Sequence, residues 1–154
     1  MPVDNDNFQV KTPREALSLL SQKMFNKYGK EALLEIEDVW YKLGCAVGKK
    51  MKKKLPDTNL ITVANSFVDG GHKRGAKVDV LELTENKFHL RGYHCAIGLN
   101  GKGKKLCWAC MGIDRGLFET ATENDLEMKI IKTLSDNDEY CEFVIKRLIK
   151  KPGD

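Results

Sequence analysis

The sequence predicts an α+β domain in which three N-terminal helices pack with a four-stranded antiparallel sheet, built from two hairpins and a crossover helix in the order ββαββ. Two observations predict this fold. Apolar residues recur at steps of three and four residues as far as Gly70, and from Ala76 onward the apolar period changes to two. The alternating stretches form two pairs, each interrupted by a polar turn, and a helical stretch separates the pairs.

The composition is typical of a soluble globular protein. The 154 residues are 42% apolar and 31% charged, which excludes disorder or a fibre as the main description. We expect a polar tail over residues 1–11 and a single α+β domain over residues 12–154. No apolar run approaches the ~20 residues that cross a bilayer, so no membrane partner is expected. The N-terminus has no apolar secretory segment and the cysteines number five, which predicts reduced thiols and a cytoplasmic location.

The charge is a weak indication of anionic partners. The formal net charge is +4, and lysines are concentrated in residues 49–54. Nucleic-acid-binding proteins usually interleave basic residues with aromatic ones on one face, and this run has no aromatic residue. We interpret the run as the solvated end of a helix, where cations also suit the helix dipole, with a phosphate-binding patch as the alternative. No nucleic-acid partner is expected.

The first helix is predicted to begin after Thr12. Thr12-Pro13-Arg14-Glu15 fits a capping box with proline at the first helical position, and Gly29 is placed to end the helix. The face expected to be buried carries apolar residues at helical spacing, which are Leu17, Leu20, Met24 and Tyr28, widened by Leu19 and Phe25.

A second and longer helix is predicted over residues 30–54. Its apolar residues recur at helical spacing, with acidic residues early and lysines late, as the helix dipole prefers. Gly44 and Gly48 each cost helix stability, roughly 1 kcal/mol relative to alanine. Their four-residue spacing predicts a face where another helix packs closely or, as the alternative, where a ligand approaches.

The remaining elements follow from breaks in the pattern. A third helix, capped by Asp57, is expected to end at Gly70-Gly71. Hairpins are predicted over residues 78–93 and 127–148, on either side of a short helix over residues 107–120. Because a small antiparallel sheet leaves an edge to cover, a homodimer is one expected assembly.

Cysteines are the first candidate functional residues. Cys107-Trp108-Ala109-Cys110 is a CxxC motif at the expected start of a helix, where amides and the helix dipole stabilise a thiolate. A closed zinc site needs four ligands, and Cys95 and Cys141 could complete one. The alternative is that these thiols are buried and act as small apolar side chains.

Asp114 extends the CxxC motif along one face of the expected helix. It follows Cys110 by four residues and Cys107 by seven. A thiolate and a carboxylate on one face suit nucleophilic or general-base chemistry, and a surface ion pair with Arg115 is the alternative. His94 neighbours Cys95, but strand alternation is expected to point the two to opposite faces, so that they form no dyad.

A resemblance covers most of the chain, from about residue 14 to 147. The residues that carry it are Gly29-Lys30-Glu31-Ala32, Gly44, Gly48, Tyr93-His94-Cys95, Cys110 with Asp114, Thr133-Leu134, Asp138 and Cys141-Glu142-Phe143. In these residues the chain resembles the 2-amino-thiazoline-4-carboxylate hydrolase family, with Asn137 where glycine is usual. Asparagine tolerates the left-handed turn that glycine would supply. The resemblance implies hydrolytic opening of a thiazoline ring by cleavage of a C–N bond.

A second resemblance begins at the CxxC motif. Cys107-Trp108 followed by Gly112 and Gly116 is similar to the helix start of the 4-vinyl reductase domain, a small-ligand-binding module. That resemblance implies N-terminal helices packed on two hairpins and a crossover helix. Metal-binding members have a cysteine and a glutamate where this chain has Thr133 and Ile130, so half of their zinc set, Cys107 and Cys141, is retained.

Two functions follow as expectations. One is a hydrolase-like enzyme that acts on a small cyclic C–N substrate, with Cys107, Cys110 and Asp114 as catalytic residues. The other is a non-enzymatic module for a small hydrophobic ligand, with a cysteine-bound zinc or iron ion as an addition. The residues expected to bind the ligand are Gly44, Gly48, Cys95 and Trp108, and those expected to hold the metal are Cys95, Cys107, Cys110 and Cys141.

Overall fold

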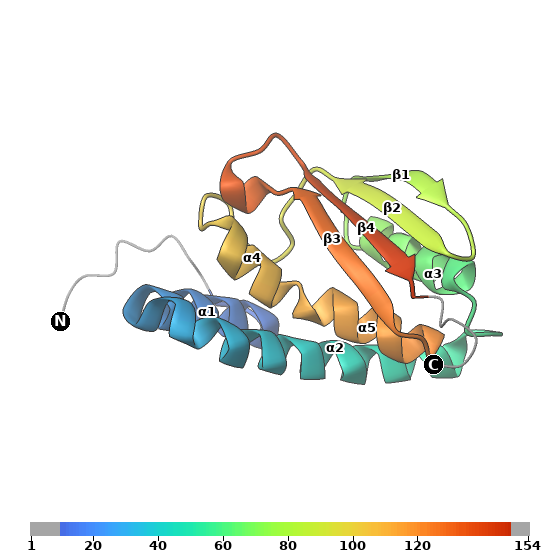
Figure 1. Ribbon diagram of the computed structural model, residues 1–154, viewed down its shortest axis with the longest axis horizontal. Helices are drawn as coiled ribbons and strands as arrows, with labels where there is room; N and C mark the ends of the chain where they lie inside the picture. Colours follow the sequence, from blue (N-terminus) through green and yellow to red (C-terminus); the bar gives the residue numbers. More distant parts are fainter. Residues whose placement is uncertain (1–9, 149–154) are drawn as a thin grey trace.

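The computed structural model describes residues 10–148, so most of the predicted tail lies outside it. Its elements in chain order are α1 (Pro13–Tyr28), the 3-10 turn η1 (Gly29–Ala32), α2 (Leu33–Lys54), α3 (Leu60–Lys73), β1 (Val78–Leu83), β2 (Lys87–Gly92), α4 (Lys104–Cys110), α5 (Gly112–Thr122), β3 (Leu126–Lys132), the 3-10 turn η2 (Leu134–Asp136) and β4 (Cys141–Arg147). The predicted α+β fold is confirmed (Figure 1).

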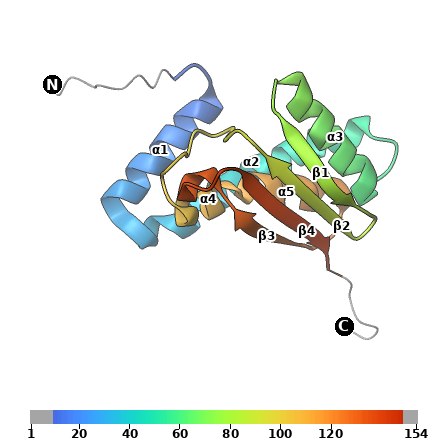
Figure 2. The ribbon, with the colours of Figure 1, turned by 90° about the horizontal axis from the view of Figure 1, so that it is seen from above.

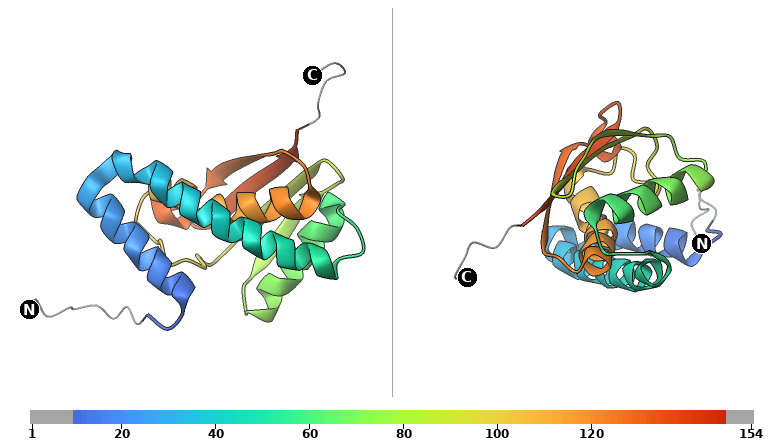
Figure 3. Two further views of the ribbon diagram at one scale, coloured as in Figure 1. Left: turned by 90° about the horizontal axis from the view of Figure 1, so that it is seen from below. Right: turned by 90° about the vertical axis from the view of Figure 1, so that its right-hand side faces the viewer.

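The sheet has the order β1-β2-β4-β3, and its neighbouring strands are antiparallel. The two hairpins therefore join through β2 and β4, where Phe88 pairs with Ile145 and Leu90 with Phe143. These four side chains are buried on the face that meets the helices. Figure 3 shows α3 and α5 against this face of the sheet, with α2 on the far side of α5.

Helices α2 and α5 pack backbone to backbone. A β-carbon on Gly44 would overlap the carbonyl group of Ile113, and one on Gly116 would overlap that of Tyr41. The same holds for Gly112, whose β-carbon would lie 2.8 Å from the carbonyl oxygen of Glu37. The close helix contact predicted from the spacing of Gly44 and Gly48 is confirmed.

The apolar interior has two parts. Between the sheet, α3 and α5 lies an aromatic group in which the rings of Phe67, Phe88 and Phe118 are 5.1–6.4 Å apart. Between α1, α2 and α4 lies a second group that includes Trp40 and Cys110. Figure 2 shows α1 beside α4. The loop after β2 closes this second group with Leu99, and Ile130 of β3 packs against it.

The predicted buried face of α1 is wrong in part. Leu20 and Tyr28 are 55% and 50% exposed, whereas Ser18, Ser21 and Gln22 are buried. Hydrogen bonds explain the reversal: the indole nitrogen of Trp40 donates to Ser21 Oγ over 2.9 Å, and Ser18 Oγ donates to the carbonyl group of Ile97. Helix α1 thus presents its serines to the rest of the protein, together with Leu17 and Phe25 of the predicted stripe. Its predicted ends are confirmed, because Thr12 caps the first turn and Gly29 the last.

Helix α3 differs from the prediction at both ends. Asn59 and not Asp57 is its N-cap, since the Asn59 side chain accepts a hydrogen bond from the amide of Ile61 over 2.9 Å. Asp57 instead accepts from the amide of Asn59 over 3.0 Å. The helix also continues through Gly70-Gly71 to Lys73.

The region between the hairpins differs as well. The single helix predicted over residues 107–120 is two helices, α4 and α5, separated at Met111. Strand β2 ends at Gly92, so His94 and Cys95 lie in a loop and not in a strand. The strand-alternation argument that separated these two side chains therefore does not apply.

Within residues 10–148, none of the helices combines the length and the apolar composition that crossing a membrane requires.

Candidate functional site

A cavity of about 250 Å³ lies between the inner face of the sheet and the helices. Helix α3, helix α5, strands β2 and β4 and the loop after β2 all contribute to its wall. Most of the lining is apolar and comes from Val47, Met51, Phe67, Val68, Leu90, Ile97, Met111, Leu117, Ile130 and Phe143. The cavity is therefore a place where apolar surface can be buried.

The sequence leaves this space open at the end of β2. Phe88, Leu90 and Gly92 alternate on the inward face of the strand, and the last of them has no side chain. A β-carbon at Gly92 would meet only Val78, at 3.8 Å, so the position has room for a larger residue. A glycine in line with two buried side chains thus leaves the hollow unfilled.

One end of the cavity is charged. Asp114, in the first turn of α5, lines the wall, and its carboxylate accepts no hydrogen bond from residues 10–148. Burial raises the pKa of Asp114 to about 6, while the positive charges of Arg14, Arg115 and Arg74 lower it. Arg115 pairs with Glu37 over 3.0 Å, whereas Arg14 and Arg74 line the cavity and are exposed to solvent.

Three thiols line another part of the wall, which are Cys95, Cys107 and Cys141. Thr133 Oγ1 donates to Cys107 Sγ over 3.2 Å, and the amide of Leu134 donates to Cys141 Sγ over 3.4 Å. Burial nevertheless raises the pKa of both Cys107 and Cys141. Helix α4 begins at Lys104, so the CxxC motif is not at its start, and desolvation outweighs the hydrogen bonds to Cys107.

The donor set does not fit a closed zinc site as these side chains are placed. Thr133 occupies the position between the sulfurs of Cys107 and Cys141, and a hydroxyl is not a ligand that structural zinc prefers. Cys110 is absent from the cavity lining and lies in the apolar group of α1, α2 and α4, where burial raises its pKa to about 12. Within residues 10–148 no three cysteine, histidine, aspartate or glutamate side chains are grouped so as to hold a metal ion.

The structure brings together only part of the residues predicted from the sequence. Cys95, Cys107, Asp114 and Cys141 line the cavity. Trp108 lies on the surface, with the guanidinium of Arg115 4.7 Å from the centre of its ring. Gly44 and Gly48 face the backbone of α5, and Cys110 faces α1 and α2. These four residues do not line the cavity.

Other lining residues are absent from the sequence prediction. Arg14 comes from α1 and Arg74 follows α3, and their sixty-residue separation gave no reason to place them together. Phe67 and Gly70 of α3 line the cavity too, and the sequence predicted Gly70 only as a helix end. A glycine within an apolar helix face is a signal of close approach or open space, and could have indicated this wall.

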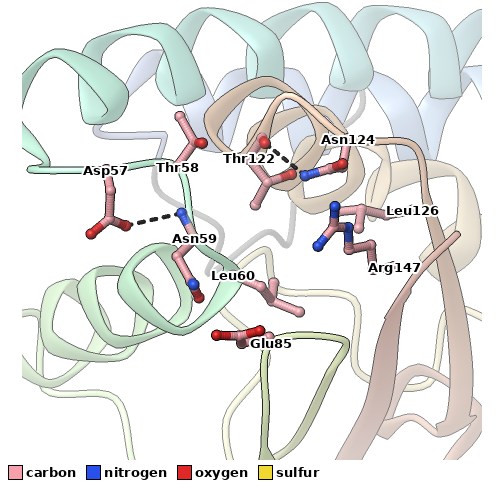
Figure 4. Close-up of a pocket in the computed structure, with 9 residues that line it drawn as sticks. All are labelled: Asp57, Thr58, Asn59, Leu60, Glu85, Thr122, Asn124, Leu126 and Arg147. Atoms are coloured by element: carbon pink, nitrogen blue, oxygen red, sulfur yellow. Dashed lines mark hydrogen bonds between the residues drawn. The ribbon is translucent and has the colours of Figure 1, made fainter. Parts of the chain in front are cut away.

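A second hollow, of about 440 Å³, lies at another place on the surface (Figure 4). It is lined by Asp57, Thr58, Asn59, Leu60, Glu85, Thr122, Asn124, Leu126 and Arg147. Several polar groups there are already bonded locally, as when Asn124 Nδ2 donates to the carbonyl group of Thr122 over 2.8 Å. Because it offers little apolar surface to bury, it is the weaker candidate for binding a small molecule.

Comparison with known proteins identifies similar folds and no family. No protein-family model and no curated protein matches the sequence. Among solved structures, the phenol-responsive sensory domain of the transcription activator PoxR, solved with phenol, has a TM-score of 0.62 at 12% identity, over 90% of this chain and 76% of that one. A trafficking protein particle complex subunit 3 from Naegleria fowleri, covalently bound to palmitic acid, has a TM-score of 0.63 at 14% identity, over 88% of this chain and 95% of that one. At these identities the similarity shows a shared α+β fold.

Proposed function

We propose that this protein binds a small, largely apolar molecule in the cavity between the sheet and the helices. The observation that carries the proposal is the cavity itself, with a mostly apolar lining and a few polar groups gathered at Asp114 and the thiols. Small-molecule sites are usually concave and apolar with a few polar groups that orient the ligand. Binding in this space needs no ionised thiol and no metal ion.

The volume indicates the size of the ligand. An engineered apolar cavity of about 150 Å³ holds one benzene molecule, so about 250 Å³ holds roughly ten heavy atoms at the same filling. A substituted single ring fits within that limit, and a sixteen-carbon acyl chain exceeds it. Of the two similar folds, the domain solved with phenol therefore offers the closer parallel in ligand size.

Titration with ethylbenzene, followed by amide chemical shifts, tests the proposal. We expect saturable shifts in the residues that line the cavity, among them Leu90 and Leu117. The variant Gly92→Leu should abolish them, because the new side chain projects into the cavity from the inward face of β2. Ala46→Leu adds an apolar side chain on the exposed part of α2 and should leave binding unchanged. Absence of saturable shifts, or equal binding by Gly92→Leu, would overturn the proposal.

Hydrolysis of a small cyclic C–N substrate is the second candidate. One observation favours it: Cys107 and Asp114 line the same cavity, as the chemistry requires. The raised pKa of the Cys107 thiol acts against it, because the thiolate is the nucleophile. Incubation with 2-amino-thiazoline-4-carboxylate tests this reading. Ring opening that is lost in both Cys107→Ser and Asp114→Asn would support it, and an unchanged substrate would remove it.

A further inference from the structure

Asp114 stands apart from the other acidic residue of the cavity wall. Glu142 also lines the cavity, but its carboxylate accepts from Arg91 over 2.8 Å and lies 3.4 Å from His89 Nε2. The Asp114 carboxylate has no such partner among the described residues. Asp114 is only partly exposed to solvent, and a carboxylate in such a position that lacks a hydrogen bond is compensated when a donor binds to it.

We propose that Asp114 selects a ligand that carries a protonated amino group on its apolar body. This inference rests on the proposed function and specifies the chemical class of its ligand. An ammonium group supplies both the opposite charge and the N–H donors that the carboxylate lacks, while the rest of the molecule meets Phe67, Leu90 and Phe143. Hydrogen bonds between two charged groups are the strongest that proteins use, and the apolar lining of the cavity strengthens them further.

The other charges around the cavity do not replace such a ligand. Arg14 and Arg74 lower the pKa of Asp114, which shows that their field reaches it, but both side chains are exposed and form no hydrogen bond with it. Their effect on a bound cation is weakened by water and salt, whereas the contact with Asp114 is direct. The Lys132 ammonium lies 5.0 Å from the ring centre of Tyr140, and His94 is exposed in the loop after β2.

Three ligands of equal size separate the contributions of charge, hydrogen bonding and apolar contact. Benzylamine, benzyl alcohol and ethylbenzene have the same number of heavy atoms, and at pH 7.5 only the first is a cation. We expect ethylbenzene to have the largest dissociation constant, benzyl alcohol a smaller one and benzylamine the smallest. Benzylamine should bind about tenfold more tightly than ethylbenzene. Benzoate, which is an anion, should bind more weakly than all three.

Two variants complete the test. Asp114→Asn keeps the shape of the side chain and removes its charge, so the preference for benzylamine should disappear while ethylbenzene still binds. Glu119→Gln removes a carboxylate from the same helix that bonds to Tyr41 outside the cavity, and should keep the preference.

The outcomes separate this inference from the proposed function. The amine inference would be overturned if benzylamine bound no more tightly than ethylbenzene, benzyl alcohol or benzoate. It would also be overturned if Asp114→Asn kept the preference for benzylamine. Either result would leave the cavity as a binding site. Failure of all four compounds to bind the unaltered protein would overturn both.

Discussion

Gly48 of α2 lies against the carbonyl group of Leu117 in α5, so that a β-carbon at position 48 would stand 2.6 Å from the carbonyl oxygen. The same residue, Leu117, lines the cavity. One face of helix α5 thus packs with its backbone against α2. Side chains on another face, among them Leu117 and Asp114, line the cavity. The position of the cavity wall depends on the absence of side chains along α2.

Gly48→Ala should therefore destabilise the fold. Alanine favours a helix more than glycine by roughly 1 kcal/mol, but here its methyl group meets backbone that cannot move aside. Overpacking of this kind costs about 1–3 kcal/mol, and we expect a net loss in the free energy of unfolding measured by urea denaturation. Gly71→Ala in α3 is the control, because its β-carbon meets only Ala76, at 3.8 Å. A Gly48→Ala protein as stable as Gly71→Ala would contradict the packing account.

The polar face of α1 leads to a second prediction. Trp40 is fully buried, and its indole nitrogen donates to Ser21 Oγ over 2.9 Å. Ser21→Ala leaves that donor without its partner and should lower the free energy of unfolding by about 1–3 kcal/mol. Trp40→Phe and the double variant complete a thermodynamic cycle, in which a coupling energy near zero would show that the hydrogen bond contributes nothing.

Local signals in the sequence predicted the elements well. Thr12 and Gly29 bound α1, the change of period located the two hairpins, and Asn137 adopts the left-handed turn expected of it, with φ of 62°. These features depend on neighbouring residues, so a pattern of a few positions determines them. Gly44 and Gly48 belong here too, because their spacing alone indicated a close helix contact.

The site was predicted only in part because it depends on packing between distant segments. The apolar stripe of α1 predicted burial of Leu20, but Trp40 and the loop at Ile97 bind serines beside the stripe, and Leu20 is turned to solvent. Cys107 and Cys110 share one motif and one apolar group, yet only Cys107 also lines the cavity. The spacing of residues along one helix does not specify which of its faces meets the cavity.

The thiols offer a third prediction. Burial raises the pKa of Cys107, and that of Cys110 to about 12, so both thiols are protonated at neutral pH and react slowly even with a reagent that enters the cavity. In the folded protein at pH 7.5 we expect iodoacetamide to modify Cys45, which is partly exposed on α2, well before either of them. Mass spectrometry of peptides after timed quenching measures the order, and rapid labelling of Cys107 in folded protein would contradict the burial account.

The ionised carboxylate of Asp114 should lower the free energy of unfolding above pH 6. Burial raises its folded-state pKa from the ordinary 3.8 to about 6, so the folded state binds the proton more tightly than the unfolded state. Stability then falls as the pH rises from about 4 to about 6, and the loss is at most about 3 kcal/mol. Asp114→Asn cannot ionise, so it should be more stable than the unaltered protein at pH 8 and equal to it at pH 3.5. Urea denaturation at the two pH values measures the difference, with Glu127→Gln, at an exposed acidic residue of β3, as the control. An Asn variant less stable at pH 8 would show that the carboxylate has a partner in the fold, whereas the expected gain would identify Asp114 as a group whose charge the folded protein alone does not compensate.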